Sequence, residues 1–345
     1  MSKLQIAIVG AGVIAEFHAK AVKDIPDAQL AAICDIDSEK ADKLASQYGC
    51  AAFDGLENML KSVDVDILTI ATPSGLHRDP AITAAQYGIH TIIEKPLEVT
   101  VERINEIIDA HNKAGTKLGC IFQTRYSESL DPLRDAIKRQ RFGRITFAGV
   151  YVPWWRSDDY YKDSWHGTWK LDGGGALMNQ AIHMIDTLCE LMPDIESVNA
   201  FTARVGHPDI EAEDSAAAAL KFKNGALGVI HGSTACYPGQ PKRLEIMGTE
   251  GTAVYLEDSY TVFEFKNSEP GDQQVLEKYA NMDYKSGFSD PKAIAHTLHT
   301  KCFEDFIESI RTGTEFKISG PEASKSVKLI ESIYKSAREG RTVSL

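Results

Sequence analysis

The sequence has no paired cysteines and none of the short spacings that mark a metal or redox site. Its six cysteines, at positions 34, 50, 120, 189, 236 and 302, are scattered along 345 residues, and no CxxC occurs. This pattern excludes a zinc knuckle and a thioredoxin-like redox motif. Unpaired thiols are typical of a reducing compartment, so we expect a cytoplasmic protein.

Long apolar runs and clusters of basic residues are also missing. No stretch approaches the roughly 20 apolar residues of a membrane helix. The opening MSKLQIAIVG is typical of a strand and not of a signal peptide. The formal net charge of -12 disfavours nucleic acid and anionic membranes as partners. The length is sufficient for two domains, each with its own core.

The first third of the chain alternates strand and helix patterns. The expected strands are Gln5–Val9, Leu30–Cys34, Val65–Ala71, Thr91–Ile93 and Leu118–Phe122. The expected helices are Val13–Val22, Ser38–Tyr48, Leu56–Ser62, Pro80–Tyr87 and Val101–Lys113. This alternation predicts an α/β fold, a doubly wound parallel sheet over residues 1–123. Ligands of such sheets bind beyond the carboxyl ends of the strands.

From residue 124 to residue 345 the pattern changes to strands followed by helices. The expected helices are Leu130–Arg139, Ala176–Glu190, Ala293–Arg311 and Pro321–Arg338. The expected strands are Ile145–Val152, Val198–Arg204, Ala216–Phe222, Gly225–Ser233, Arg243–Met247, Ala253–Leu256 and Thr261–Phe265. The order predicts a second, α+β domain with a largely antiparallel open sheet.

A glycine motif, GAGVIA, lies between the first expected strand and the first expected helix. Gly10 allows the tight turn, Gly12 lets the backbone approach a pyrophosphate, and Ala15 is small enough for close packing. The helix start at Val13 and Ile14 offers N–H groups and a positive dipole end to phosphates. A glycine turn alone is weak evidence, but its place between strand and helix indicates a Rossmann dinucleotide site.

Asp35 follows the second expected strand, where a carboxylate accepts hydrogen bonds from the adenosine ribose and repels a 2′-phosphate. Ile36 and Asp37 come next, so no Arg or Ser follows to bind such a phosphate. An Asp after a strand is also common in ordinary loops. With the glycine motif, Asp35 favours NAD as the cofactor over NADP.

Two further strand ends carry residues that we expect at the cofactor. Thr72, Pro73 and His77 belong to the loop after the strand ending at Ala71, although His77 also fits an ordinary helix start. Glu94 and Lys95 end the strand that begins at Thr91. A lysine here, beside a nicotinamide, could bind a substrate hydroxyl and stabilise the developing alkoxide.

A polar stripe interrupts the apolar helix expected after the glycine run 173–175. Asn179, His183 and Asp186 stand at positions i, i+4 and i+7, which share one face of an α-helix. A lone histidine on such a helix is often a satisfied core residue, whereas an exposed one can act as a general base. We expect no metal site, because His296 and His299 are far along the chain.

Together these motifs resemble the Gfo/Idh/MocA family of oxidoreductases, which includes inositol and sugar dehydrogenases. The resemblance covers the glycine motif, Asp35, the EKP of residues 94–96 and the sequence GGGALMNQAIH. It implies that Lys95 and His183 form the catalytic pair. Family members often carry Asp four residues before the histidine, whereas this chain has Asn179, as one subset does. The family also implies homodimers or homotetramers formed through the C-terminal sheet.

An aromatic segment precedes the helix of His183 and indicates the class of substrate. Aromatic faces pack on sugar rings, although such residues also serve in cores and interfaces. The expected substrate contacts are Lys95, Arg156, Tyr160, Tyr161, Trp165, His166, Asn179 and His183. Relatives in this subset resemble WRGTW where residues 165–169 read WHGTW. Since His lacks the fixed fork of Arg, we expect a neutral sugar, glycoside or cyclitol.

The expected reaction is reversible oxidation of a secondary ring hydroxyl to a ketone, with hydride passing to NAD. His183 would take the proton and Lys95 would stabilise the alkoxide, or the two roles could be exchanged. Three alternatives use similar residues: a hydrolase that keeps NAD and oxidises its sugar transiently, a regulator that binds NAD without catalysis, and a reductase of a ketone or imine. The presence of both Lys95 and His183 argues against the regulator.

Overall fold

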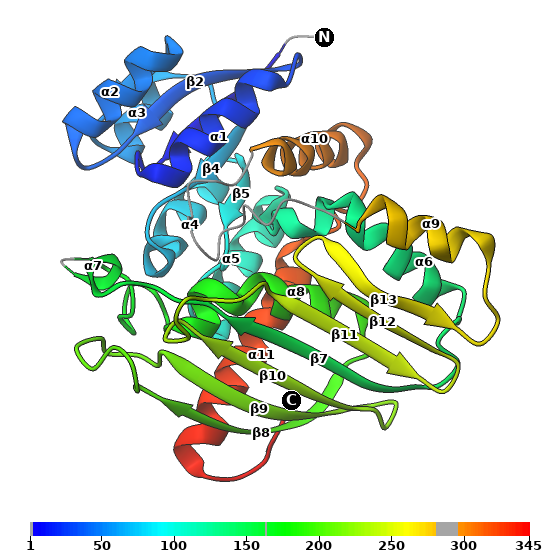
Figure 1. The fold of residues 1–345 in the computed structure, drawn as a ribbon. Helices are drawn as coiled ribbons and strands as arrows, with labels where there is room; N and C mark the ends of the chain where they lie inside the picture. Colours follow the sequence, from blue (N-terminus) through cyan, green and yellow to red (C-terminus); the bar gives the residue numbers. More distant parts are fainter. Residues whose placement is uncertain (1–2, 163, 281–295) are drawn as a thin grey trace. The chain divides into compact units, whose positions relative to one another are not determined.

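The computed structural model describes residues 3–162, 164–280 and 296–345 (Figure 1). The chain forms two compact units. The first consists of Met1–Gln123 and Ala295–Ser324, and the second of Thr124–Ile294 and Lys325–Leu345. Among the described residues, no helix combines the length and the apolar character needed to cross a bilayer.

The first unit contains a six-stranded parallel sheet in the order β3-β2-β1-β4-β5-β6. Its strands are β1 (Leu4–Val9), β2 (Ala28–Cys34), β3 (Ala51–Phe53), β4 (Ile67–Ile70), β5 (His90–Glu94) and β6 (Leu118–Ile121). The connecting helices are α1 (Val13–Asp24), α2 (Ser38–Tyr48), α3 (Leu56–Ser62), α4 (Arg78–Gln86) and α5 (Val101–Ala114). This order confirms the doubly wound fold, with its switch point between β1 and β4.

The core of this sheet follows from the burial of its central strands. Every residue of β4 is buried, as expected for a parallel strand covered on both faces. Ile8 and Ile33 from the sheet pack against Ala15 and Ala19 of α1. Because these helix residues are small, the glycine turn before α1 is held close to the ends of β1 and β4.

The structure differs from the expected domain division at one place, because residues 296–324 group with the first unit. Helix α10 (Thr297–Thr312) contacts α1, and its buried face includes Phe303 and Phe306. Cys120 N–H donates to the carbonyl of Ile318 at 3.0 Å, which ties the following segment to β6. The helix expected over 293–311 begins outside the described residues.

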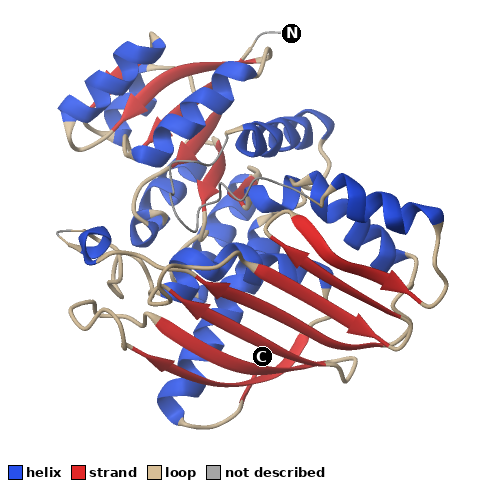
Figure 2. Ribbon diagram, viewed as in Figure 1, coloured by secondary structure: helices blue, strands red, loops and turns tan. Residues whose placement is uncertain are grey.

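The second unit contains an eight-stranded sheet in the order β13-β12-β11-β7-β10-β9-β8-β14 (Figure 2). Its strands are β7 (Ile145–Pro153), β8 (Ile195–Ala203), β9 (Ser215–Phe222), β10 (Leu227–Ser233), β11 (Arg243–Gly248), β12 (Gly251–Leu256), β13 (Ser259–Phe265) and β14 (Val343–Ser344). Among the described strand pairs of this second sheet, only β7–β10 is parallel. The predicted largely antiparallel sheet is therefore confirmed.

The helices of the second unit are α6 (Asp131–Lys138), α7 (Asp158–Tyr161), α8 (Ile182–Leu191), α9 (Pro270–Lys278) and α11 (Gly320–Glu339), the last of which begins in the first unit. Helix α8 contacts β7, and α9 contacts β13. Alternate residues of β9 are buried, and those between them are exposed. Phe201 of β8 and Leu227 of β10, which flank β9, are 77% and 59% exposed. The sheet thus has a covered face and an open face that carries apolar side chains.

Candidate active site

The glycine turn of the first unit has the geometry of a phosphate cradle. Gly10 has a φ of +96°, and a Cβ there would lie 2.6 Å from the carbonyl oxygen of Ala71, so only glycine fits. A Cβ on Gly12 would meet no described atom within 4 Å. Gly12 caps α1 without a side-chain hydrogen bond, and Val13 is 64% exposed. The first turn of α1 therefore presents its N–H groups to an anionic ligand.

Asp35, at the end of β2, also fits a dinucleotide. Its carboxylate accepts hydrogen bonds from the Ala11 N–H at 2.6 Å and the Asp37 N–H at 2.9 Å. It therefore fixes the glycine turn, while the side chain stays half-buried beside the fully exposed Ile36. Within the loop after β4, Thr72 Oγ1 is buried without a hydrogen-bond partner among the described residues. These features fit NAD, which binds at this edge of such sheets.

The structure corrects the role of His77, which was expected to contact the cofactor. The residue is fully buried, and burial lowers the pKa of its ring. Its two ring nitrogens lie 3.0 Å from the carbonyl oxygen of Thr72 and 2.9 Å from that of Pro96. The ring joins the loop after β4 to the loop after β5 and exposes no atom to a ligand.

Glu94 likewise points into the interior of the first unit. Its Oε1 lies 2.8 Å from His18 Nε2 and 3.6 Å from His299 Nε2, and its Oε2 accepts the Lys95 N–H at 3.1 Å. Burial would raise the pKa of Glu94, but the hydrogen bond with His18 and the nearby ring of His299 hold that pKa well below its usual range. Burial lowers the pKa of His18, so this ring is a neutral donor to a carboxylate. The carboxylate of Glu94 thus holds the main chain of the half-buried Lys95, and its expected contact with the cofactor stays a prediction.

This buried cluster was missed because its members are distant in the sequence. His18 comes from α1, Glu94 from β5 and His299 from α10, and their ligating atoms all lie within 4.8 Å of one another. Such spacing is compatible with a small cation. The hydrogen bonds of Glu94 are sufficient to explain why its carboxylate is buried, with no cation required. The absence of a metal site stays a prediction.

In the second unit, the helix expected over 176–190 has an irregular start. Residues Ala176–Ala181 form a π-helix, η4, which continues into α8. Asn179 and His183 are partly exposed, whereas Asp186 is 1% exposed and forms a bidentate ion pair with Arg125 at 2.7 Å for both contacts. Asp186 is therefore committed to an interior ion pair, whereas Asn179 and His183 stay partly exposed. The π-helix changes the register of Asn179 relative to His183, because only His183 and Asp186 lie in the regular helix α8.

Asn179 belongs to a polar network whose other members sequence reasoning mostly missed. Its Nδ2 donates to Asp172 Oδ1 at 2.6 Å, and its Oδ1 accepts from Gln180 Nε2 at 3.0 Å. Gln180 Oε1 in turn accepts from Arg156 Nη2 at 2.9 Å. Arg156 is 5% exposed, so most of its guanidinium supports this network, and the expected contact with a substrate stays a prediction. The available signal for Asp172 was its place directly before the glycine run.

The aromatic segment packs around the network. The rings of Tyr160 and His166 stack, with centroids 4.4 Å apart and planes 2° from parallel, and Trp165 lies 4.1 Å from His166. Tyr160 Oη accepts from Gln180 Nε2 at 2.9 Å, and burial raises its pKa. Burial raises the pKa of Tyr161 to about 12, while its hydroxyl donates to Thr234. Four of the expected substrate residues, Tyr160, Trp165, His166 and Asn179, are therefore brought together within one unit.

The start of the π-helix is held by another residue that the sequence did not reveal, Glu213. Its carboxylate accepts the N–H groups of Gly175 at 3.0 Å and Leu177 at 2.9 Å and the hydroxyl of Tyr334 at 2.9 Å. Burial raises the pKa of Glu213 to about 7, against the opposing effect of these hydrogen bonds.

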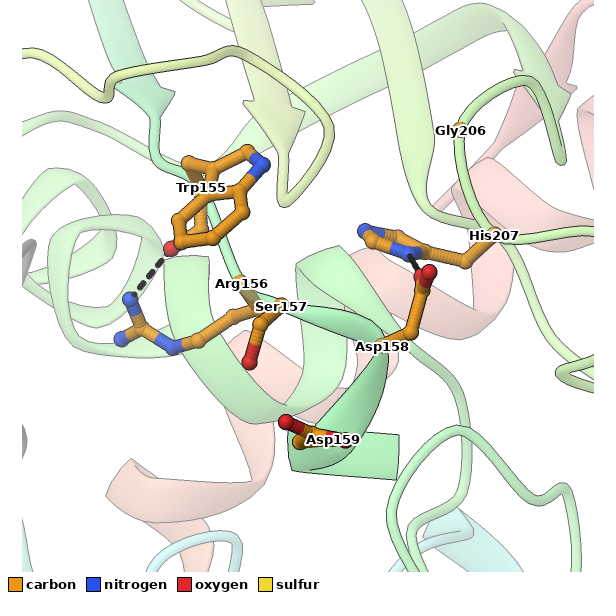
Figure 3. Close-up of a pocket in the computed structure, with 7 residues that line it drawn as sticks. All are labelled: Trp155, Arg156, Ser157, Asp158, Asp159, Gly206 and His207. Carbon is orange, nitrogen blue, oxygen red and sulfur yellow. Dashed lines mark hydrogen bonds and ion pairs between the residues drawn. The ribbon is translucent and has the colours of Figure 1, made fainter. Parts of the chain in front are cut away.

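A hollow of about 420 Å³ lies beside the aromatic segment (Figure 3). Its lining includes Trp155, Arg156, Asp158, Asp159 and His207, and His207 Nδ1 lies 3.0 Å from Asp158 Oδ1. Asp158 and Asp159 are exposed and acidic. The lining thus combines carboxylate acceptors with a guanidinium donor, and hydroxyl groups can bind to both.

Family models match both parts of the chain. Residues 4–122 match an oxidoreductase family with an NAD-binding Rossmann fold, and residues 131–254 match the GFO/IDH/MocA C-terminal domain. The matches span most of the chain and both sheets.

Individual relatives agree with these models. The chain is 24% identical to the myo-inositol 2-dehydrogenase of Thermotoga maritima, over 99% of this chain and 98% of the relative. It is 30% identical to the D-glucoside 3-dehydrogenase of Escherichia coli, and the match covers 66% of this chain and 69% of the relative. Among solved structures, the WlbA dehydrogenase of Bordetella pertussis, in complex with NADH and UDP-GlcNAcA, is 33% identical. The match has a TM-score of 0.92 and covers 100% of this chain and 98% of that one.

Proposed function

The chain belongs to the Gfo/Idh/MocA family of NAD-dependent sugar dehydrogenases, and we propose that it oxidises a secondary ring hydroxyl of a neutral sugar, glycoside or cyclitol to a ketone. The observation that carries this proposal is the polar surface on an otherwise buried helix. Asn179 and His183 are partly exposed where their neighbours are buried, next to stacked Tyr160 and His166. Partly exposed polar side chains beside aromatic faces suit a sugar ring.

Gly10, Gly12, Asp35 and Thr72 would hold the cofactor, because they supply a turn open to phosphate, a ribose acceptor and a buried hydroxyl. When bound, NAD supplies the acceptor for the hydride. We assign to His183 the removal of the hydroxyl proton, since a histidine titrates near neutral pH. We assign to the Lys95 ammonium the stabilisation of the alkoxide that develops on the same oxygen. Glu94 supports this role through the main-chain N–H of Lys95.

The test is a panel of neutral sugars, inositols, glycosides and sugar acids, followed by NADH absorbance. We expect NAD reduction with at least one neutral member, and a higher kcat/KM with NAD than with NADP. A panel that yields free sugar from glycosides without net NADH would instead identify the hydrolase alternative. Binding of NAD without turnover of any member would contradict the proposal.

A nucleotide-linked sugar acid is a second candidate substrate. It is favoured by one observation, the full-length similarity to the WlbA dehydrogenase in complex with UDP-GlcNAcA. His166, in the position where related sequences carry Arg, argues for a neutral sugar. Comparing kcat/KM for a neutral sugar and a UDP-linked uronate in the same assay distinguishes the two.

We further propose that the open face of the C-terminal sheet binds a second copy of this chain. Phe201 and Leu227 are exposed on it, and exposed apolar patches of this kind mark interfaces. Sedimentation of Phe201→Glu and Leu227→Glu against wild type tests this, with dissociation to monomer as the expected result and an unchanged oligomer as the contrary one.

A further inference from the structure

Asp172 is a buried carboxylate that the proposed reaction does not use directly. It is 1% exposed, and a charge so deeply buried is stable only with compensating donors. Donors are supplied by Asn179 Nδ2 at 2.6 Å and by the Gly167 N–H at 2.8 Å. His166 Nδ1 lies 4.0 Å from Asp172 Oδ2. The carboxylate is therefore centred between the aromatic segment and the helix of the site.

The charge of Asp172 determines the orientation of two amides. A carboxylate only accepts hydrogen bonds, so it requires the NH2 group of Asn179 on its side. The Asn179 oxygen then faces Gln180 Nε2 at 3.0 Å, and the Gln180 oxygen faces Arg156 Nη2 at 2.9 Å. A chain of equally oriented amides thus joins a buried anion, Asp172, to a buried cation, Arg156. Reversing either amide would place donor against donor or acceptor against acceptor.

The same orientation sets the state of His166. Asn179 Nδ2 lies 3.3 Å from His166 Nδ1, so this ring nitrogen must accept, and the ring proton resides on Nε2. Stacking on Tyr160, which itself accepts from Gln180 at 2.9 Å, fixes the plane of the ring. The side chain is 22% exposed, so part of the ring is accessible to a ligand.

We propose that Asp172 is a positioning residue of the sugar site: it fixes the amide of Asn179 and thereby presents His166 as a neutral hydrogen-bond donor to a substrate hydroxyl. The substrate part of this proposal rests on the proposed function, whereas the state of His166 does not. A neutral N–H donor binds a hydroxyl oxygen, and the ligand needs no negative charge. The proposal therefore assigns the selectivity for neutral sugars to His166, as positioned by Asp172 and Asn179.

The first experiment is independent of the substrate. The wild type, labelled with 15N-histidine, is compared with Asp172→Asn and Asn179→Ala, and the His166 signals are identified by their loss in His166→Ala. We expect protonated Nε2 and unprotonated Nδ1 in the wild type at neutral pH, and a mixed or inverted tautomer in both variants. Protonated Nδ1 in the wild type, or an unchanged tautomer in both variants, would overturn the proposal. Asn179→Ala serves alone if Asp172→Asn does not fold.

The second experiment is a double-mutant cycle on a neutral substrate found in the panel. Asp172→Asn should raise KM about tenfold to a hundredfold, the range for losing a hydrogen bond to a charged group. In the His166→Ala background the same change should matter less than about twofold, because its effect passes through His166. Glu190→Gln, which removes a carboxylate from α8 that pairs with Arg134, is the control and should leave KM unchanged.

Additive effects of Asp172→Asn and His166→Ala would assign Asp172 a purely structural role and end the proposal. An inactive wild type would count against the proposed function, and the tautomer measurement would still decide the role of Asp172. The two failures are therefore distinguishable.

Discussion

The two units of this protein build their sites in different ways. In the first, the backbone makes the site: the glycine turn, the start of α1 and the strand ends place N–H groups where a cofactor binds. In the second, a side-chain network makes it, since Asn179 is positioned through Asp172 and Gln180. A backbone site depends on a few conformations that only glycine permits, whereas a side-chain site depends on charges and amide orientations. The first therefore suits a constant cofactor, and the second suits a variable substrate.

The largest effect is expected from the two residues proposed to be catalytic, Lys95 and His183. Lys95→Ala and His183→Ala should each lower kcat roughly a hundredfold or more, the scale of a lost acid–base group. NAD affinity, measured by fluorescence titration, should be unchanged in His183→Ala because that residue belongs to the other unit. Near-normal turnover of His183→Ala would return this residue to an ordinary core role.

The next largest effect is a dependence of the free energy of unfolding on pH, caused by Glu213 in the second unit. Glu213 has a pKa of about 7 in the folded protein, above the value in an unfolded chain. The native state then holds a proton that the unfolded state has lost, so stability decreases as pH rises from about 4.5 to about 7 and is level above that. The decrease from this one group is about 3 kcal/mol.

Glu213→Gln should remove this decrease, because glutamine does not titrate. Free energies of unfolding from denaturant titrations across this pH range measure it. Glu211→Gln, an exposed carboxylate two residues away, is the matched control and should keep the wild-type slope. A Glu213→Gln variant with the wild-type slope would show that the carboxyl is ionised in the native state throughout.

The backbone site is tested by two alanine substitutions two residues apart. Gly10→Ala requires φ +96° and a contact with Ala71 at 2.6 Å, so it should destabilise the fold by about 1–3 kcal/mol or more. Gly12→Ala meets open space and should leave Tm unchanged. It should nevertheless weaken NAD binding about tenfold, since the added methyl lies where the pyrophosphate approaches. Equal effects of both variants on Tm would contradict the assignment of Gly12 to the ligand.

The smallest effect is a change in cofactor preference. Asp35→Ser should narrow the ratio of kcat/KM for NAD to that for NADP, because it relieves repulsion of the 2′-phosphate. Asp37→Asn, which alters the cap of α2 one turn away, should leave that ratio unchanged. A wild type that prefers NADP tenfold would show that the interpretation of Asp35 is wrong.

The comparison also explains what could be predicted from the sequence. The glycine turn and Asp35 are local signals, because the strand, the turn and the helix follow one another along the chain. The cluster of His18, Glu94 and His299 is not local: its members come from three separate elements, and only the fold brings them together. His77 and Glu94 were expected at the cofactor because they follow strand ends, a local signal. In the fold, the ring of His77 and the carboxylate of Glu94 point into the interior of the first unit.

In the second unit, the irregular helix limited the prediction. An α-helical period groups Asn179, His183 and Asp186, but Asn179 lies in the π-helix Ala176–Ala181, which shifts its register relative to α8. Asp186 pairs with the buried Arg125, a partner that the period does not reveal. Asp172, seven residues before Asn179, contacts it only because the glycine run 173–175 turns the chain back. Such a contact depends on backbone angles that no periodicity records.

The central claim is that a ring carbon of the sugar loses its hydride to NAD. The most direct measurement uses a substrate from the panel deuterated at its ring carbons, with deuterium in the product cofactor determined by mass spectrometry. The account predicts one deuterium in each NADH formed and a ketone on the sugar ring. NADH that carries no deuterium, or sugar released without any reduced cofactor, would contradict it.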